Sequence, residues 1–175
     1  MVISNSHKFG VAWGVIERSR VPTFFYGWVI LIINEKVYPS HMRFNHTIDV
    51  VFRNMQSTFT QINSHFLKED YKQDELGDRA ITLQDIESGD INGLYHIGLG
   101  DLESCYENDI VDTISFSMDI GFHGSEERLF FSDDGYKTLS EVRFPRGTVE
   151  KVIMALPNKP EDFIKQMDSS PVLVV

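Results

Sequence analysis

Cysteine is nearly absent from this sequence, which has Cys105 alone among 175 residues. An intramolecular disulfide is therefore impossible, and zinc sites built from several cysteines are excluded. Long hydrophobic runs are also missing: the longest, Phe24 to Ile33, has ten residues, about half of what a membrane-spanning helix needs. The first residues lack the basic and apolar regions of a secretory signal. We therefore expect a cytoplasmic protein that does not bind a membrane.

Basic residues are also few compared with acidic residues. The sequence has 16 Lys and Arg against 26 Asp and Glu, a formal net charge of −10, which disfavours direct binding of nucleic acid and favours a basic partner. The acids are concentrated in residues 69–112, where 13 acidic and two basic residues give a net charge of −11, so the other 131 residues sum to +1. Composition leaves two interpretations of this segment open, a solvated face and a binding surface.

The common signatures of enzyme active sites are missing as well. The sequence contains no G-x-G-x-x-G, no G-x-x-x-x-G-K-[ST], no G-x-S-x-G and no H-E-x-x-H. The six histidines are scattered, and the spacing of His41 and His46 aligns two ligands neither on a helix nor on a strand. Glu103 and Glu107 lie near Cys105, and their negative charges disfavour a nucleophilic thiolate. We expect no metal, no cofactor and no catalytic residue.

Alternating apolar residues predict several strands. Residues 8–18 place Phe9, Val11, Trp13 and Val15 at every second position, which is typical of a strand with one buried face. The apolar residues 24–33 predict a central strand buried on both faces, including Trp28. The remaining predicted strands are a short one around residues 37–38 after a tight turn, and residues 94–99, 113–120, 127–131 and 137–144, the last two joined by a turn at 132–135.

Steps of three and four residues between apolar positions predict a long helix over residues 47–66, with Asn45 or Thr47 as its N-cap. Its inward stripe is Ile48, Val51, Phe52, Met55, Phe59, Ile62 and Phe66. A second helix is predicted after Thr148 as the cap, with Val149, Val152, Ile153 and Leu156 facing inward. A short helix starts at Pro160, with Phe163, Ile164 and Met167 facing inward.

These elements predict a single α+β domain over residues 1–168. We expect a mainly antiparallel sheet of about six to eight strands, packed by the long helix and a C-terminal helix. Residues 169–175 form a tail, either loose or docked as an edge strand through its apolar residues 172–175.

The acidic segment is the candidate binding surface, because carboxylates complement a basic partner and tyrosines supply anchoring area. The candidate partner-binding residues are Asp70, Tyr71, Asp74, Glu75, Asp78, Asp85, Glu87, Asp90, Tyr95, Asp101, Glu103, Tyr106, Glu107 and Asp109.

Three stretches carry a resemblance to a known family: HKFGVAWGVIE at residues 7–17, YGWVILIINEKVYP at 26–39, and ERLFFSDDGYKTLSEVRFPRGTVEKVI at 127–153. In this order, around a long helix and an acidic middle, they resemble the immunity protein 42 family of bacterial toxin–immunity systems, such as those of contact-dependent growth inhibition. The match covers roughly residues 5–155. The resemblance implies a cytoplasmic, non-enzymatic protein that binds one cognate toxin domain, 1:1, and blocks its active site.

Combining the resemblance with the acidic charge, we expect the toxin to be a basic nuclease whose active site is covered by carboxylates of residues 69–112. Two other functions remain open at this stage. One is a small acidic hydrolase that uses an Asp/Glu pair with His96 or His123. The other is an adaptor that mimics nucleic acid and has no toxin partner.

Overall fold

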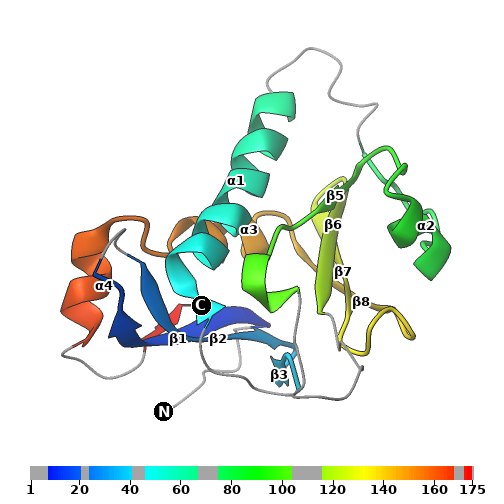
Figure 1. The fold of residues 1–175 in the computed structure, drawn as a ribbon. Coiled ribbons are helices and arrows are strands. Elements are labelled where there is room, and N and C mark those ends of the chain that lie inside the picture. The colour runs from blue at the N-terminus through cyan, green and yellow to red at the C-terminus, as the bar shows by residue number, and fades with distance from the viewer. Residues whose placement is uncertain are drawn as a thin grey trace.

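The computed structural model describes residues 8–20, 24–40, 46–66, 75–103, 116–167 and 172–174, which form two antiparallel sheets and four α-helices (Figure 1). The first sheet has the order β3-β2-β1-β9, with β4 also paired to β2. Its strands are β1 (Phe9–Arg18), β2 (Phe25–Ile33), β3 (Lys36–Tyr38), β4 (His46–Thr47) and β9 (Val172–Val174). The second sheet has the order β5-β6-β7-β8, formed by β5 (Leu94–His96), β6 (Ser117–His123), β7 (Glu126–Ser132) and β8 (Ser140–Pro145). The α+β class is confirmed, but the strands form two sheets instead of one.

The helices are α1 (Ile48–Phe66), α2 (Leu83–Ser88), α3 (Thr148–Met154) and α4 (Pro160–Met167). Helix α1 packs on β2 of the first sheet and contacts β5 of the second, while α3 contacts β1 and β8. These two helices therefore bridge the two sheets, and α2 lies on the far side of the second sheet from α1 (Figure 1). No helix in the described part of the chain is long and apolar enough to cross a membrane.

The predicted long helix is confirmed. Its stripe residues from Ile48 to Ile62 are all buried in one core, and among them Phe52 contacts Trp13 of β1 edge to face, with ring centroids 5.4 Å apart. The side chain of Phe66 and the proposed cap Asn45 lie outside the described residues.

The prediction that β2 is buried on both faces is wrong. Tyr26, Trp28 and Ile30 alternate with fully buried residues and keep part of their surface exposed. The cause is one-sided coverage, since Phe52 of α1 and Phe163 of α4 pack together and against Trp13 on the inward face of the sheet. Strand β2 is nevertheless central, because it pairs with β1 on one side and with β3 and β4 on the other.

Helix α3 begins differently from the prediction. Its N-cap is Gly147 in the left-handed conformation, φ 85°, and the hydroxyl of Thr148 donates to the Pro145 carbonyl instead of capping the helix. The cap comes from β7: the buried Glu127 carboxylate accepts the N–H groups of Gly147 at 2.8 Å and of Val149. Glu127, 20 residues before Gly147 in the sequence, therefore caps α3 in place of the predicted cap Thr148.

The outward face of the second sheet is covered by the segment 75–93. Arg128 of β7, 1% exposed, donates to both carboxylate oxygens of Glu141 at 2.8 and 3.0 Å. The same guanidinium donates to the carbonyls of Gly77 at 2.7 Å and Arg79 at 2.8 Å. Leu76 packs onto Gly121, where a Cβ atom would lie 2.4 Å from its side chain. The second sheet therefore lies between the core and the segment 75–93, and the buried Arg128 holds that segment to the sheet through hydrogen bonds.

The predictions for the C-terminal part are confirmed except in detail. Helix α4 starts at Pro160 with Phe163 buried, but Ile164 is 39% exposed and does not face the core. Of the two alternatives for the tail, the structure has the edge strand, because β9 pairs with Val11–Trp13 of β1. The turn after β7 is longer than predicted, and β8 starts at Ser140.

Candidate partner-binding surfaces

The structure describes part of the predicted acidic binding surface. Glu75, Asp78, Asp85, Glu87, Asp90, Tyr95, Asp101 and Glu103 lie within the described residues. Asp70, Tyr71, Asp74, Tyr106, Glu107 and Asp109 lie outside them, as does Cys105.

Glu75 and Asp78 are engaged in ion pairs within the chain. Glu75 accepts from Arg146 at 3.0 Å, and Asp78 accepts from Arg143 at 3.0 Å and lies 3.1 Å from the His123 ring. A backbone N–H bond followed by the Arg146 bond lowers the pKa of Glu75, and the Arg143 hydrogen bond is the main cause of the lowered pKa of Asp78. These two carboxylates fasten the segment 75–79 to the second sheet, and arginines offset much of their charge.

Helix α2 has one acidic residue that is bonded within the chain and one that is exposed. Asp85 forms a capping box with Thr82 and an ion pair with Arg79 at 2.9 Å, and the hydrogen bonds from Thr82 are the main cause of its lowered pKa. Glu87 on the same helix and Asp90 just after it are exposed and have no charged partner within the described part of the chain. Glu87 and Asp90 are therefore the described carboxylates of this surface best placed to meet a basic partner.

Glu103 belongs to a cluster around His96. The His96 ring lies 3.2 Å from the Asp119 carboxylate of β6 and 3.5 Å from the Glu103 carboxylate. Hydrogen bonds to Asp119 first and Glu103 second raise the pKa of His96 to about 10, so the ring is an imidazolium at neutral pH. A ring held in that form is a poor general base, because its lone pair is already protonated.

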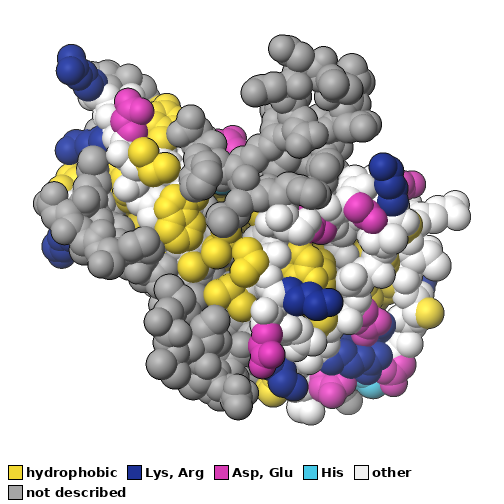
Figure 2. Space-filling view, turned by 90° about the horizontal axis from the view of Figure 1, so that it is seen from below, with side chains coloured by type: hydrophobic (Ala, Val, Ile, Leu, Met, Phe, Trp, Pro, Cys, Tyr) yellow, Lys and Arg dark blue, Asp and Glu magenta, His cyan; other side chains and the backbone are white. Residues whose placement is uncertain are grey.

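Asp101 and Tyr95 take structural positions. Asp101 accepts the backbone N–H of Thr47 at 2.9 Å and so joins the 3-10 turn at Gly100–Leu102 to the start of α1. Tyr95 packs against the core, with its ring 6.2 Å from that of Phe122. The eight described residues therefore lie at several places on the second sheet and beside α1, and on the face shown in Figure 2 the described acidic and basic side chains are intermixed.

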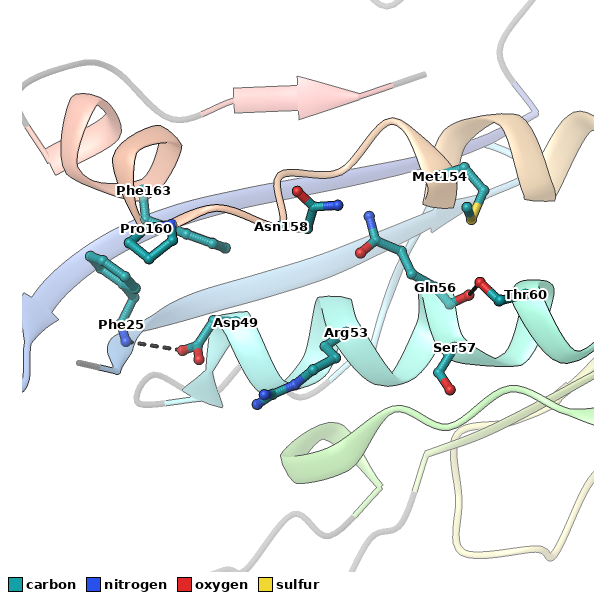
Figure 3. Close-up of a pocket in the computed structure, with 10 residues that line it drawn as sticks. All are labelled: Phe25, Asp49, Arg53, Gln56, Ser57, Thr60, Met154, Asn158, Pro160 and Phe163. Atoms are coloured by element: carbon teal, nitrogen blue, oxygen red, sulfur yellow. Dashed lines mark hydrogen bonds between the residues drawn. The ribbon is translucent and has the colours of Figure 1, made fainter. Parts of the chain in front are cut away.

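A groove that was not predicted from the sequence lies between α1 and the stretch from α3 to α4 (Figure 3). Its volume is about 560 Å³. One wall consists of α1 residues, the other runs from Met154 at the end of α3 to Phe163 of α4, and Phe25 of β2 lies at one end (Figure 3). The lining residues are Phe25, Asp49, Arg53, Gln56, Ser57, Thr60, Met154, Asn158, Pro160 and Phe163.

A sequence signal for the α1 wall does exist. Arg53, Ser57 and Thr60 are spaced four and three residues apart, so they form one polar line beside the buried stripe of the helix. The opposite wall has no such signal, because it is assembled from the end of α3, the connection after it and the start of α4. No group of three or more His, Cys, Asp or Glu side chains suited to a metal ion occurs among the residues that the structure describes.

The comparisons with known proteins give one family match and one likeness in fold. The family model described as Immunity protein 42 matches residues 1–159. Among solved structures, the crystal structure of CdiI from Burkholderia dolosa AUO158 is similar in fold, with a TM-score of 0.53 and 14% sequence identity over 85% of this chain and 92% of that one. No curated protein matches the chain. Because the family match extends over most of the sequence, the chain belongs to the immunity protein 42 family.

Proposed function

We propose that this protein neutralises one cognate bacterial toxin domain by binding it 1:1 in the cytoplasm and covering its active site. The observation that carries the proposal is the match to an immunity protein family over residues 1–159. The likeness in fold to a protein named CdiI supports the same class of function.

The geometry of the histidines gives the hydrolase alternative no support. His96 is held as an imidazolium between two carboxylates, and His123 is paired with Asp78 in a network that fastens the segment 75–79. Neither ring lines the groove between α1 and α4. A binding protein needs none of these groups to turn over a substrate, so inhibition by association is the better fit.

We further propose that the toxin is a basic nuclease and that the acidic residues 69–112 guide it onto the protein. The chain's net charge of −10 supports a basic partner. Internal arginines already pair with Glu75, Asp78 and Asp85, so the contribution expected from the described residues centres on Glu87 and Asp90. Exposed charges of this kind mostly raise the association rate.

Co-expression tests the main proposal. A C-terminal toxin domain of a secreted protein, chosen by the adjacency of its gene to this one, is expressed with and without the chain, and growth and complex formation are measured. We expect growth arrest without the chain, rescue with it, and a 1:1 complex in size-exclusion chromatography. Arrest that persists despite abundant folded chain contradicts the proposal.

Salt and charge reversal test the electrostatic part. The association rate is expected to fall steeply between low and high salt, and to fall further for Glu87→Lys combined with Asp90→Lys. Glu17→Lys combined with Glu35→Lys changes the net charge equally on the first sheet and is the matched control. Equal rates for the two double variants remove Glu87 and Asp90 from the surface, and a purified toxin without nuclease activity refutes the nuclease assignment.

A further inference from the structure

The groove between α1 and the α3–α4 stretch is held open by bonds within the chain. The Gln56 amide donates to the Ile153 carbonyl at 3.3 Å and to the Leu156 carbonyl at 2.8 Å, which ties the two walls together at the base. At one end, the rings of Phe25 and Phe163 stack with centroids 4.8 Å apart. A preformed groove loses little conformational entropy when a partner enters it.

The floor and rim of the groove differ in polarity. Met154 at one end of the groove is 45% exposed, and Pro160 at the other end is exposed as well, whereas the rings of Phe25 and Phe163 beside Pro160 are each only 1% exposed (Figure 3). Methionine adapts its shape to a partner and is enriched, with arginine, in protein interfaces. The groove therefore offers Met154 as an exposed apolar contact, with the polar wall of α1 opposite it.

The polar groups of the groove divide into those already bonded and those still available. The Asp49 carboxylate accepts the backbone N–H of Phe25 at 3.0 Å, and the Thr60 hydroxyl donates to the Gln56 carbonyl at 2.9 Å. Arg53, by contrast, has no ion pair within the described part of the chain, and its side chain is exposed.

Charge decides which partner fits. The Arg53 guanidinium offers a planar set of N–H donors that matches a carboxylate in bidentate geometry. Uncharged hydrogen-bond donors are added by Ser57, one turn further along α1, and by Asn158 on the opposite wall. Asp49 is the opposing charge, but one of its oxygens is already satisfied by Phe25.

We infer that this groove receives a segment of the toxin in which an acidic residue, bound by Arg53, is followed along the groove by an apolar side chain that packs on Met154. The inference rests on the proposed function and names the surface that carries it. It also separates two roles, because the acidic residues 69–112 speed association whereas the groove holds the complex together.

Two substitutions of opposite charge test the inference. Binding of the cognate toxin domain is measured by surface plasmon resonance for Arg53→Met and Asp49→Asn, with Lys137→Met, in the β7–β8 connection, as the matched control. We expect Arg53→Met to weaken binding roughly 30-fold, mainly through faster dissociation. Asp49→Asn keeps an oxygen for the Phe25 N–H and removes the charge that repels a carboxylate, so binding stays equal or tightens. Lys137→Met leaves the affinity unchanged.

A third variant tests the groove by volume instead of charge. Ser57→Trp places a large side chain from the exposed side of α1 into the groove and is expected to abolish tight binding while the melting temperature stays the same. If the unaltered chain binds the toxin but Arg53→Met and Ser57→Trp bind equally well, the inference is wrong and the proposed function stands. If Asp49→Asn weakens binding as much as Arg53→Met, the segment is not acidic and the inference is again refuted. If the unaltered chain does not bind the toxin, the proposed function itself has failed.

Discussion

The buried carboxylate of Glu127 makes a specific prediction about stability and pH. The side chain lies in β7 with no exposed surface and caps α3 through the N–H groups of Gly147 and Val149. Burial is the dominant influence and raises its pKa to about 7, although the two N–H donors favour the ionised form. The unfolded chain ionises the same group at an ordinary pKa near 4.3.

The sign of the effect follows from these two values. The folded state binds the proton more tightly than the unfolded state, so the free energy of unfolding rises as the pH falls from above 7 towards about 4.3. Between its two pKa values, Glu127 changes the free energy of unfolding by about 1.4 kcal/mol per pH unit. Most of this pH range lies between pH 8 and pH 5, where the total change is about 3 kcal/mol. This direction is opposite to that of Glu75 and Asp78, whose lowered pKa values make the folded state lose stability only at lower pH.

The assay compares the unaltered chain with Glu127→Gln. Urea unfolding is followed by tryptophan fluorescence at pH 5, 6, 7 and 8, and the difference in free energy of unfolding between the two proteins isolates the titration of Glu127. We expect this difference to grow in favour of the unaltered chain by about 3 kcal/mol from pH 8 to pH 5. Glu126→Gln, at the exposed neighbouring position, is the control. A difference that stays constant or shrinks as the pH falls refutes the reasoning.

Three further predictions concern other buried or paired groups. His96→Asn removes an imidazolium whose raised pKa stabilises the folded state fully below pH 6.5 and progressively less as the pH rises towards 10. Because the ring is half exposed, the effect is small: in urea unfolding, we expect the stability advantage of the unaltered chain over His96→Asn to be about 1 kcal/mol smaller at pH 9 than at pH 6. Arg128→Met removes the guanidinium that bonds Glu141 and the carbonyls of Gly77 and Arg79. Because Glu141 keeps its ion pair with Arg143, we expect a cost of about 1–3 kcal/mol, with faster proteolysis of residues 75–93 as the accompanying sign. Phe59→Ala opens a cavity under α1 and should cost about 3–5 kcal/mol; an unchanged denaturant midpoint contradicts its inward position.

Patterns that depend on near neighbours were predictable from the sequence. The three- and four-residue steps gave α1 its buried stripe, because side chains one turn apart necessarily share a helix face. The tight turn before β3 was predicted too, and the structure places Asn34 and Glu35 there at φ 49° and 68°. Pro160 marked the start of α4, since proline suits the first turn of a helix.

The face that each side chain presents to the rest of the molecule was less predictable. An apolar run such as β2 shows that both sides of a strand tolerate burial, but only the placement of α1 and α4 decided that Trp28 stays partly exposed. The alternation within strands likewise says which residues share a face and does not say which strands pair, so the division into two sheets was not foreseen.

The sequence by itself determined the α+β class, the long helix, the impossibility of an intramolecular disulfide and the place where the negative charge is concentrated. Only the tertiary structure decided how that charge is used, because Arg143 and Arg146 reach Asp78 and Glu75 across 65 and 71 residues of chain. It also made the groove, whose walls meet through a Gln56 hydrogen bond that spans 100 residues. Contacts at such separations depend on how the whole chain packs, which no local pattern encodes, and the surfaces proposed to bind the partner are built from them.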